Sequence, residues 1–170
     1  MVLSPRSNRA LDTIETLAQD SLLEARRSVA ALRPRLLAQT PLPEALRSLV
    51  AATEGDPDPP ALSLMIDPAL APLPTTVEDE LFRIAQEAVA NAMRHARAGH
   101  IDIRLRAGKP EGVRLDIIDD GQGFAMGAVP PGYGMTGMTE RAGRIGAGLT
   151  VISAPGAGTR VSAVWPAETG

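Results

Sequence analysis

Hydrophobic residues at the start of this chain recur at steps of three and four, which is the period of an amphipathic helix. Over residues 9–33 the apolar positions are Leu11, Ile14, Ala18, Leu22, Ala25, Val29 and Leu32, with charged residues between them. This pattern predicts one long helix that ends at Arg33, because the residue before Pro34 is disfavoured in helical geometry. A lone helix cannot bury such a stripe, so it needs a partner from this chain, a second copy or another sequence.

The pattern changes after residue 40, where shorter helical and strand-like segments alternate. Residues 41–50 predict a short helix with Pro43 near its first turn, and the three prolines of residues 55–60 predict a loop. Apolar and polar residues alternate in 100–106 and in 113–117, on either side of a glycine-containing turn, which predicts an antiparallel strand pair. Further strands are predicted over 61–66, 149–153 and 159–165, and further helices over 77–97 and 136–145. This order predicts an α+β domain, a two-layer sandwich of a mixed sheet covered on one face by helices.

The predicted helix over residues 77–97 carries polar residues at the rim of its apolar arc. On a helical wheel Asn91 and His95 fall just inside the edge of that arc, and Glu87 lies one step outward. An amide oxygen four residues after a carboxylate can hold Mg²⁺ while the carboxylate orients a nucleophile or water. A single histidine in an apolar arc is more often a core residue than a ligand, so for His95 both interpretations stay open.

A second polar motif follows the strand that ends near residue 119. Asp119, Gly121 and Gly123 form an Asp-x-Gly-x-Gly sequence, which taken alone is also what a simple turn requires. In the functional interpretation the Asp119 carboxylate accepts a hydrogen bond from an exocyclic amino group such as that of adenine. The two glycines would let the backbone approach the ring. The glycine-rich stretch that follows, ahead of a helix start, suits phosphate groups, since backbone N–H groups and the positive helix end favour anions.

Composition excludes several other classes of protein. The 170 residues include no cysteine, so disulfides, thiolate metal sites and thiol nucleophiles are ruled out. A net charge of −3 and only one Trp, one Tyr and two Phe argue against nucleic-acid binding. No apolar run approaches the ~18 residues needed to span a bilayer. Residues 132–137 match Gly-x-Gly-x-x-Gly, but no strand precedes them and no acid follows at the spacing of a dinucleotide fold, so hydride transfer is disfavoured.

Several motifs in register resemble the Bergerat-fold (GHKL) ATP-binding domain, within it the nitrate-sensor-like class of bacterial sensor histidine kinases. They are Glu-Ala-Arg-Arg-Ser-Val-Ala-Ala-Leu-Arg-Pro at 24–34, Phe-Arg-Ile-Ala-Gln-Glu-Ala-Val-Ala-Asn-Ala at 82–92, Asp-Asp-Gly-Gln-Gly-Phe at 119–124, Gly-Tyr-Gly-Met-Thr-Gly-Met-Thr-Glu-Arg-Ala at 132–142 and Ser-Ala-Pro-Gly-Ala-Gly-Thr-Arg-Val at 153–161. The resemblance implies ATP and Mg²⁺ as cofactors, with Asn91 coordinating Mg²⁺, Glu87 assisting phosphoryl transfer and Asp119 recognising adenine. It places Gly121 and Gly123 around the purine. It also implies a part in nucleotide binding for His95, Gly132, Gly134, Met135, Gly137, Met138 and Thr159, whose hydroxyl would reach the adenine edge.

The same resemblance predicts how the chain is organised and what it works with. Residues 1–40 would hold the second helix of a dimerisation and phosphotransfer domain, and residues 41–170 the catalytic domain. The family's acceptor histidine, which an acid follows, has no counterpart, because His95 and His100 stand in other contexts. We therefore expect the acceptor-histidine helical domain to lie outside this sequence and this chain alone not to autophosphorylate. We also expect a response regulator as partner, a homodimer in the intact protein, and a cytoplasmic location with any membrane anchor upstream.

Two other functions fit the same pocket. One is a Bergerat-fold ATPase or an anti-sigma-type serine kinase, in which water or a serine hydroxyl is the nucleophile. The long helix over residues 9–33, with its Ala-Leu-Arg-Pro end, argues against that function. The other is a non-enzymatic module that senses nucleotides.

Overall fold

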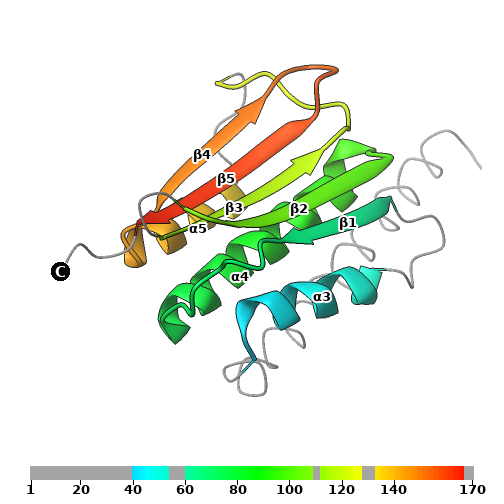
Figure 1. Cartoon of the computed structure of the whole chain (residues 1–170). Coiled ribbons are helices and arrows are strands. Elements are labelled where there is room, and N and C mark those ends of the chain that lie inside the picture. Colours follow the sequence, from blue (N-terminus) through cyan, green and yellow to red (C-terminus); the bar gives the residue numbers. More distant parts are fainter. Residues whose placement is uncertain (1–39, 54–59, 109–111, 128–132, 167–170) are drawn as a thin grey trace, which may run out of the picture. The chain divides into compact units, whose positions relative to one another are not determined.

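The computed structural model describes residues 40–53, 60–108, 112–127 and 133–166 (Figure 1). The helix predicted over residues 9–33 lies outside this part of the chain. The helical elements are α3 (Leu42–Thr53), α4 (Thr75–Asn91), the π-helical turn η1 (Ala92–Ala96) and α5 (Tyr133–Arg144). The strands are β1 (Ala61–Ile66), β2 (His100–Ala107), β3 (Gly112–Asp119), β4 (Gly148–Ser153) and β5 (Thr159–Pro166). In this part of the chain no helix is long and apolar enough to cross a membrane.

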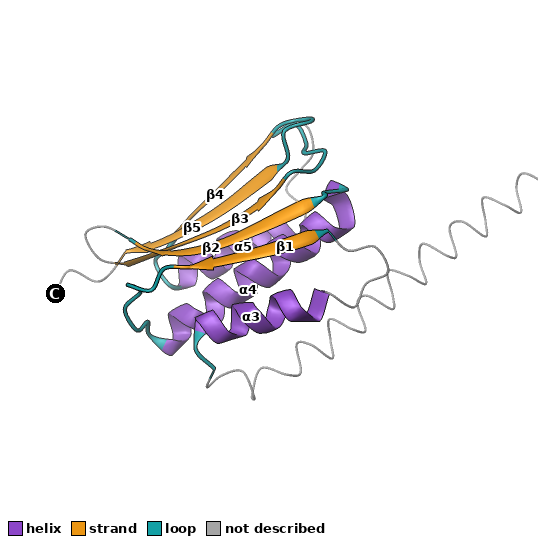
Figure 2. Cartoon of the chain, turned by 45° about the vertical axis from the view of Figure 1, so that its right-hand side comes forward, coloured by secondary structure: helices purple, strands orange, loops and turns teal. Residues whose placement is uncertain are grey.

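The five strands form one mixed sheet in the order β1-β2-β3-β5-β4. Strand β1 pairs with β2 in parallel, and the other neighbours are antiparallel. Helices α3, α4 and α5 lie together on one side of the sheet (Figure 2). The predicted two-layer α+β architecture and the β2–β3 hairpin are therefore confirmed.

The core lies between the sheet and α4, as the sequence pattern requires. Alternate residues of β2, Ile101, Ile103 and Leu105, are fully buried, while their neighbours in the strand are not. From α4, Leu81 and Ile84 are also fully buried. Burying each side chain of this size contributes about 1.5–3 kcal/mol. This packing fixes the rotation of α4 and so decides which of its residues remain at the surface.

Helices α3 and α4 are held together at their starts. Helix α4 begins after Pro74, whose φ of −57° suits a helix entry, and the Val77 N–H donates to the Pro74 carbonyl at 2.9 Å. Glu78 in the first turn of α4 accepts a hydrogen bond from the Leu42 N–H at 3.1 Å. That N–H belongs to the first turn of α3, where backbone donors lack an intrahelical partner. The Glu78 carboxylate therefore caps the start of α3. It also lies at the N-terminal end of α4, where the helix dipole favours a negative charge.

The other end of α4 departs from regular α-helix. The chain continues into the π-turn η1, and Arg97 then ends it with a left-handed φ of 50°. Single π-turns at the end of an α-helix are rare and concentrate at functional sites. The turn carries the Ala96 carbonyl toward the loop that follows β3.

Candidate functional site

Asp119 is the last residue of β3, and its carboxylate is anchored on one side only. The side-chain oxygen Oδ1 accepts hydrogen bonds from the N–H groups of Gly121 at 3.0 Å and Thr159 at 3.2 Å, and the residue is 7% exposed. The second oxygen, Oδ2, bonds to none of the described residues. Among those residues no buried side-chain oxygen or nitrogen lacks a partner, so Oδ2 retains contact with solvent. The carboxylate is thus fixed in direction and presents one free acceptor oxygen.

The glycines after Asp119 are required by the way the loop packs against the protein itself. A Cβ on Gly121 would collide with the Ala96 carbonyl, and the Gln122 N–H donates to that same carbonyl at 2.7 Å. Gly123 has a left-handed φ of 57°, and a Cβ there would lie 2.8 Å from the Gly158 carbonyl oxygen. The loop is therefore clamped between the end of η1 and the β4–β5 turn. The expectation that these glycines also face a purine ring stays a prediction.

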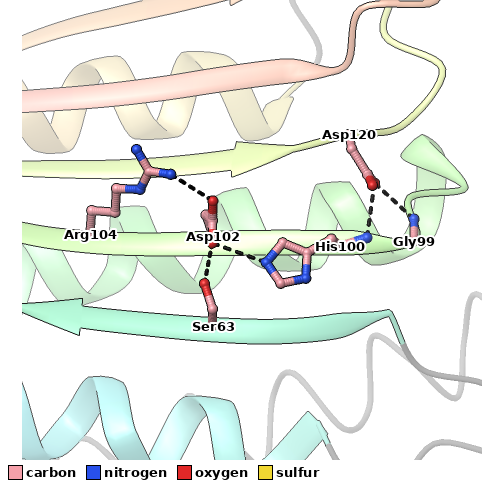
Figure 3. A network of polar contacts seen from close by, with 6 residues as sticks. All are labelled: Ser63, Gly99, His100, Asp102, Arg104 and Asp120. Carbon is pink, nitrogen blue, oxygen red and sulfur yellow. Dashed lines mark hydrogen bonds and ion pairs between the residues drawn. The ribbon is translucent and has the colours of Figure 1, made fainter.

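Asp120, the next residue, holds the same loop from the other side. Its Oδ1 accepts from the N–H groups of Gly99 and His100, at 2.8 Å each (Figure 3). The chain between η1 and β2 is thereby tied to the end of β3. Asp119 and the last turn of α4 are held in one arrangement as a result.

Ser153, which the sequence analysis did not single out, joins the loop to Thr159. Its buried Oγ contacts the Phe124 N–H at 2.9 Å, the Gly158 carbonyl at 2.9 Å and the Thr159 Oγ1 at 3.0 Å. The signal available in the sequence was a serine at the end of an alternating strand, two residues before the Pro155-Gly156 pair of the last motif. Such a signal is weak without the tertiary contacts.

Glu87 and Asn91 lie one helical turn apart on α4, and both are half-buried. Arg94 reaches both: its Nη2 lies 3.9 Å from the Glu87 Oε1 and 3.4 Å from the Asn91 Oδ1. Arg94 was not predicted as a site residue, because an arginine on a helix is usually solvated. Its spacing of three residues from Asn91 was the available signal. A carboxylate and an amide from α4 and a guanidinium from η1 thus meet in one polar cluster.

The first turn of α5 rests on these side chains. A Cβ on Gly134 would collide with the Glu87 carboxylate and lie 3.2 Å from the Asn91 Nδ2. Helix α5 is also joined to α4 by Glu80, whose carboxylate oxygens lie 3.3 Å from Arg141 Nη1 and 3.3 Å from Arg144 Nη1. The N-terminal end of α5, where backbone N–H groups have no intrahelical acceptor and the helix dipole is positive, therefore lies against the polar cluster.

The remaining predicted site residues differ in where they lie. His95 is exposed on η1 instead of lying in the core, and its backbone carbonyl accepts from the Gln122 side-chain amide at 2.6 Å. Met138 is 1% exposed within the core cluster, Met135 packs at its edge, and Gly137 has open space around it. Gly132 lies outside the described residues. The nucleotide-binding roles of these residues stay predictions.

The shifted pKa values belong to the face of the sheet opposite α3, α4 and α5. Hydrogen bonds from Ser63 first, then from His100 and Arg104, lower the pKa of Asp102 to about 2 (Figure 3). Burial alone raises the pKa of Asp116, but hydrogen bonds from Arg114 and Ser162 hold it below its ordinary value. Ser63 and His100 both bond to the carboxylate and not to one another, so this is no Ser-His-Asp catalytic arrangement.

Comparison with known proteins identifies the class. Residues 76–169 match the family described as histidine kinase-, DNA gyrase B-, and HSP90-like ATPase. The chain belongs to this family. Its described part is an ATP-binding domain of the sensor histidine kinase type. The resemblance found in the sequence motifs is therefore confirmed.

Particular relatives agree with that assignment. The sensor protein VraS of Staphylococcus saprophyticus is 34% identical over 160 residues, which cover 94% of this chain and 45% of that protein. The chain thus spans about half the length of the curated relatives it matches. The fold is that of the histidine kinase domain from the Erythrobacter litoralis blue-light activated histidine kinase EL346, with a TM-score of 0.60, 21% identity and coverage of 74% of this chain and 61% of that one. It is also that of the Acinetobacter baumannii histidine kinase AdeS, with a TM-score of 0.63, 15% identity and coverage of 99% and 88%.

Proposed function

We propose that this domain binds Mg-ATP and passes the γ-phosphoryl group to a histidine on a separate helical domain, for relay to a response regulator. The observation that carries the proposal is the Asp119 carboxylate, whose Oδ1 is locked by two backbone N–H groups while Oδ2 stays open. A fixed acceptor of this kind suits the exocyclic amino group of adenine. The polar cluster on α4 provides the phosphate end of the same site.

The described residues fit Mg²⁺ only together with a nucleotide. Nowhere in the described part of the chain do three or more His, Asp or Glu side chains converge in a cluster that could hold a metal ion. Asn91 supplies one amide oxygen, and Mg²⁺ typically takes one or two protein ligands and completes its shell with phosphate oxygens and water. When bound, the ion neutralises charge on the phosphates. Asn91 is therefore the residue that would hold it.

The other residues of the cluster would have separate roles in phosphoryl transfer. In the reaction the bond between the γ-phosphorus and the bridging oxygen breaks, a bond to an imidazole nitrogen forms, and ADP leaves. Glu87 would orient the acceptor imidazole and take up its proton. Arg94, within 3.9 Å of Glu87, would offset phosphate charge, as would the N-terminal end of α5. Positioning and charge neutralisation are the main contributions a protein makes to phosphoryl transfer.

The organisation of the intact protein is part of the proposal. Residues 1–40 would contribute the second helix of a dimerisation and phosphotransfer domain, and residues 41–170 the catalytic domain. Neither His95 nor His100 would be the acceptor, because neither is followed by an acid as the family's acceptor histidine is, and His100 Nε2 also bonds to Asp102. The protein would act in the cytoplasm, and the full-length protein would form a homodimer.

Titration calorimetry with Mg-ATP tests the proposal. Asp119→Asn keeps the shape of the side chain and an oxygen for the two backbone N–H groups, but turns an amide donor toward the open side. We expect ATP affinity to fall roughly 10- to 150-fold, the loss that accompanies removal of a hydrogen bond to a charged group. Asp102→Asn, on the opposite face of the sheet, is the matched control and should keep the affinity. Equal affinities for the unaltered chain and Asp119→Asn would overturn the adenine assignment.

A further inference from the structure

The Ser153 hydroxyl sits at a junction of three hydrogen bonds. The Phe124 N–H, the Gly158 carbonyl and the Thr159 hydroxyl all lie between 2.9 and 3.0 Å from Ser153 Oγ. The residue is 9% exposed, so water does not compete freely for these bonds. Thr159 is predicted to reach the adenine edge, Gly158 precedes it in the turn between β4 and β5, and Phe124 begins the glycine-rich segment.

A count of protons fixes the direction of each bond. A serine hydroxyl has one hydrogen and two lone pairs. The Phe124 amide can only donate and the Gly158 carbonyl can only accept, so the single hydrogen of Ser153 goes to Gly158. The remaining lone pair of Ser153 then accepts from Thr159, which uses the only hydrogen of the Thr159 hydroxyl. Thr159 is left with lone pairs alone to offer to a ligand.

We propose that Ser153 is a specificity-determining positioning residue, which makes the Thr159 hydroxyl an obligate acceptor and so selects purines with an amino group at position 6. This inference rests on the proposed ATP site and deepens it. The Asp119 carboxylate beside Thr159 is an acceptor as well, since its Oδ1 bonds the Thr159 N–H and its Oδ2 carries no hydrogen when ionised. Because Asp119 and Thr159 pair across β3 and β5, the proposed purine site would present two acceptors side by side.

Two acceptors discriminate sharply between adenine and 6-oxo purines. The amino group of adenine donates hydrogen bonds, whereas the carbonyl of hypoxanthine or guanine at the same position only accepts. A site built around a particular hydrogen-bond pattern rejects an analogue that lacks it, because buried groups are left unpaired. Without Ser153, the Thr159 hydroxyl could turn its hydrogen toward a 6-oxo group and half of this discrimination would disappear.

The test compares Mg-ATP with Mg-ITP, its 6-oxo analogue, by titration calorimetry. The unaltered chain should bind ATP at least about tenfold more tightly than ITP. In Ser153→Ala the preference should shrink by about tenfold, because ATP binds more weakly while ITP binds equally well or better. Ser162→Ala, another buried serine that bonds Asp116 at 2.6 Å on the opposite face of the sheet, is the matched control and should keep the ratio.

A merely structural role for Ser153 gives a different result. Loss of the bond to the Phe124 N–H would loosen the loop and weaken both nucleotides equally, so an unchanged ratio overturns the inference. Thr159→Val supplies a second check that does not depend on the fold of Ser153→Ala. In that background the additional Ser153→Ala change should leave the ratio unaltered, and a further change would show that Ser153 acts without Thr159. Absence of ATP binding by the unaltered chain would instead overturn the proposed function and this inference with it.

Discussion

Gly134 in the first turn of α5 lies so close to Glu87 on α4 that any side chain at position 134 would have to displace the Glu87 carboxylate. The residue proposed to handle the acceptor proton is thus in direct contact with the helix that begins after the glycine-rich segment. Any change in where α5 starts will be felt at that carboxylate. The contact also explains why a glycine, the least favourable residue for a helix apart from proline, stands inside α5.

Gly134→Ala should therefore separate activity from stability. The new methyl group would displace the Glu87 carboxylate, and a misplacement of about 1 Å costs on the order of 10²-fold in rate. Stability should hold or rise, because alanine favours a helix by about 1 kcal/mol over glycine. Transfer to a supplied acceptor domain and urea unfolding would measure the two quantities. Gly143→Ala, in the same helix with nothing within 4 Å of the new Cβ, should gain stability and keep its rate.

Glu87 and Asn91 should differ in which step they affect. Glu87→Gln should leave Mg-ATP affinity nearly intact and slow transfer by on the order of 10²-fold or more, the usual contribution of a general base. Asn91→Ala should lower both, because the metal helps to hold the phosphates. Nucleotide titration beside trans-phosphorylation distinguishes the two. Equal losses of affinity in both variants would make Glu87 a structural residue.

Gly121→Ala should destabilise the fold itself. Its Cβ would meet the Ala96 backbone carbonyl, which cannot rotate away as a side chain can. Forcing an extra carbon into a packed site costs typically about 1–3 kcal/mol. Gly148→Ala, where nothing lies within 4 Å, should stay within about 0.5 kcal/mol of the unaltered chain. Thermal unfolding followed by circular dichroism would show both effects, and equal midpoints for the two variants would contradict this packing of Gly121 against Ala96.

Asp102 should contribute a pH-dependent share of stability on the face opposite the site. Its pKa is lowered from 3.8 to about 2 in the folded protein, so the folded state binds fewer protons than the unfolded state between these values. The contribution is complete above about pH 4 and is lost as pH falls toward 2, and for this partly exposed group it is on the order of 1 kcal/mol. Urea unfolding of Asp102→Asn should show a deficit near pH 6 that closes toward pH 2. A deficit that is constant across this range would exclude the linkage.

The sequence predicted the sheet better than the helix ends. Alternation over 100–106 located β2 (His100–Ala107) nearly to the residue, because one face of that strand is buried and the period is unambiguous. The start of α5 at Tyr133, three residues before the predicted one, depends on the contact between Gly134 and Glu87, which no local pattern encodes. Tertiary packing overrode the low helix propensity of the glycines there.

The same limit applies to the site. A helical wheel drawn at 100° per residue put His95 at the edge of the core face. The π-turn η1 has i→i+5 hydrogen bonds, so the angle between successive residues is smaller there than in an α-helix. His95 is therefore turned away from the core and is exposed. Asp119, Glu87 and Asn91 stood out because their types and spacings carry chemistry. Ser153 and Arg94 did not stand out. The role of Ser153 depends on a neighbour far away in the sequence, and that of Arg94 depends on the direction of its side chain.

The π-turn η1 lies between the two ends of the proposed site. Its Ala96 carbonyl accepts a hydrogen bond from the loop after Asp119, and α4, which runs directly into η1, carries Glu87 roughly 13 Å away at 1.5 Å per residue. The adenine end and the phosphate end of the proposed site are therefore joined by one continuous helical segment. Helix α5 is joined to that segment by the ion pairs from Glu80 to Arg141 and Arg144, which are partly exposed and are therefore weakened by salt. High ionic strength should thus loosen the attachment of α5 to α4.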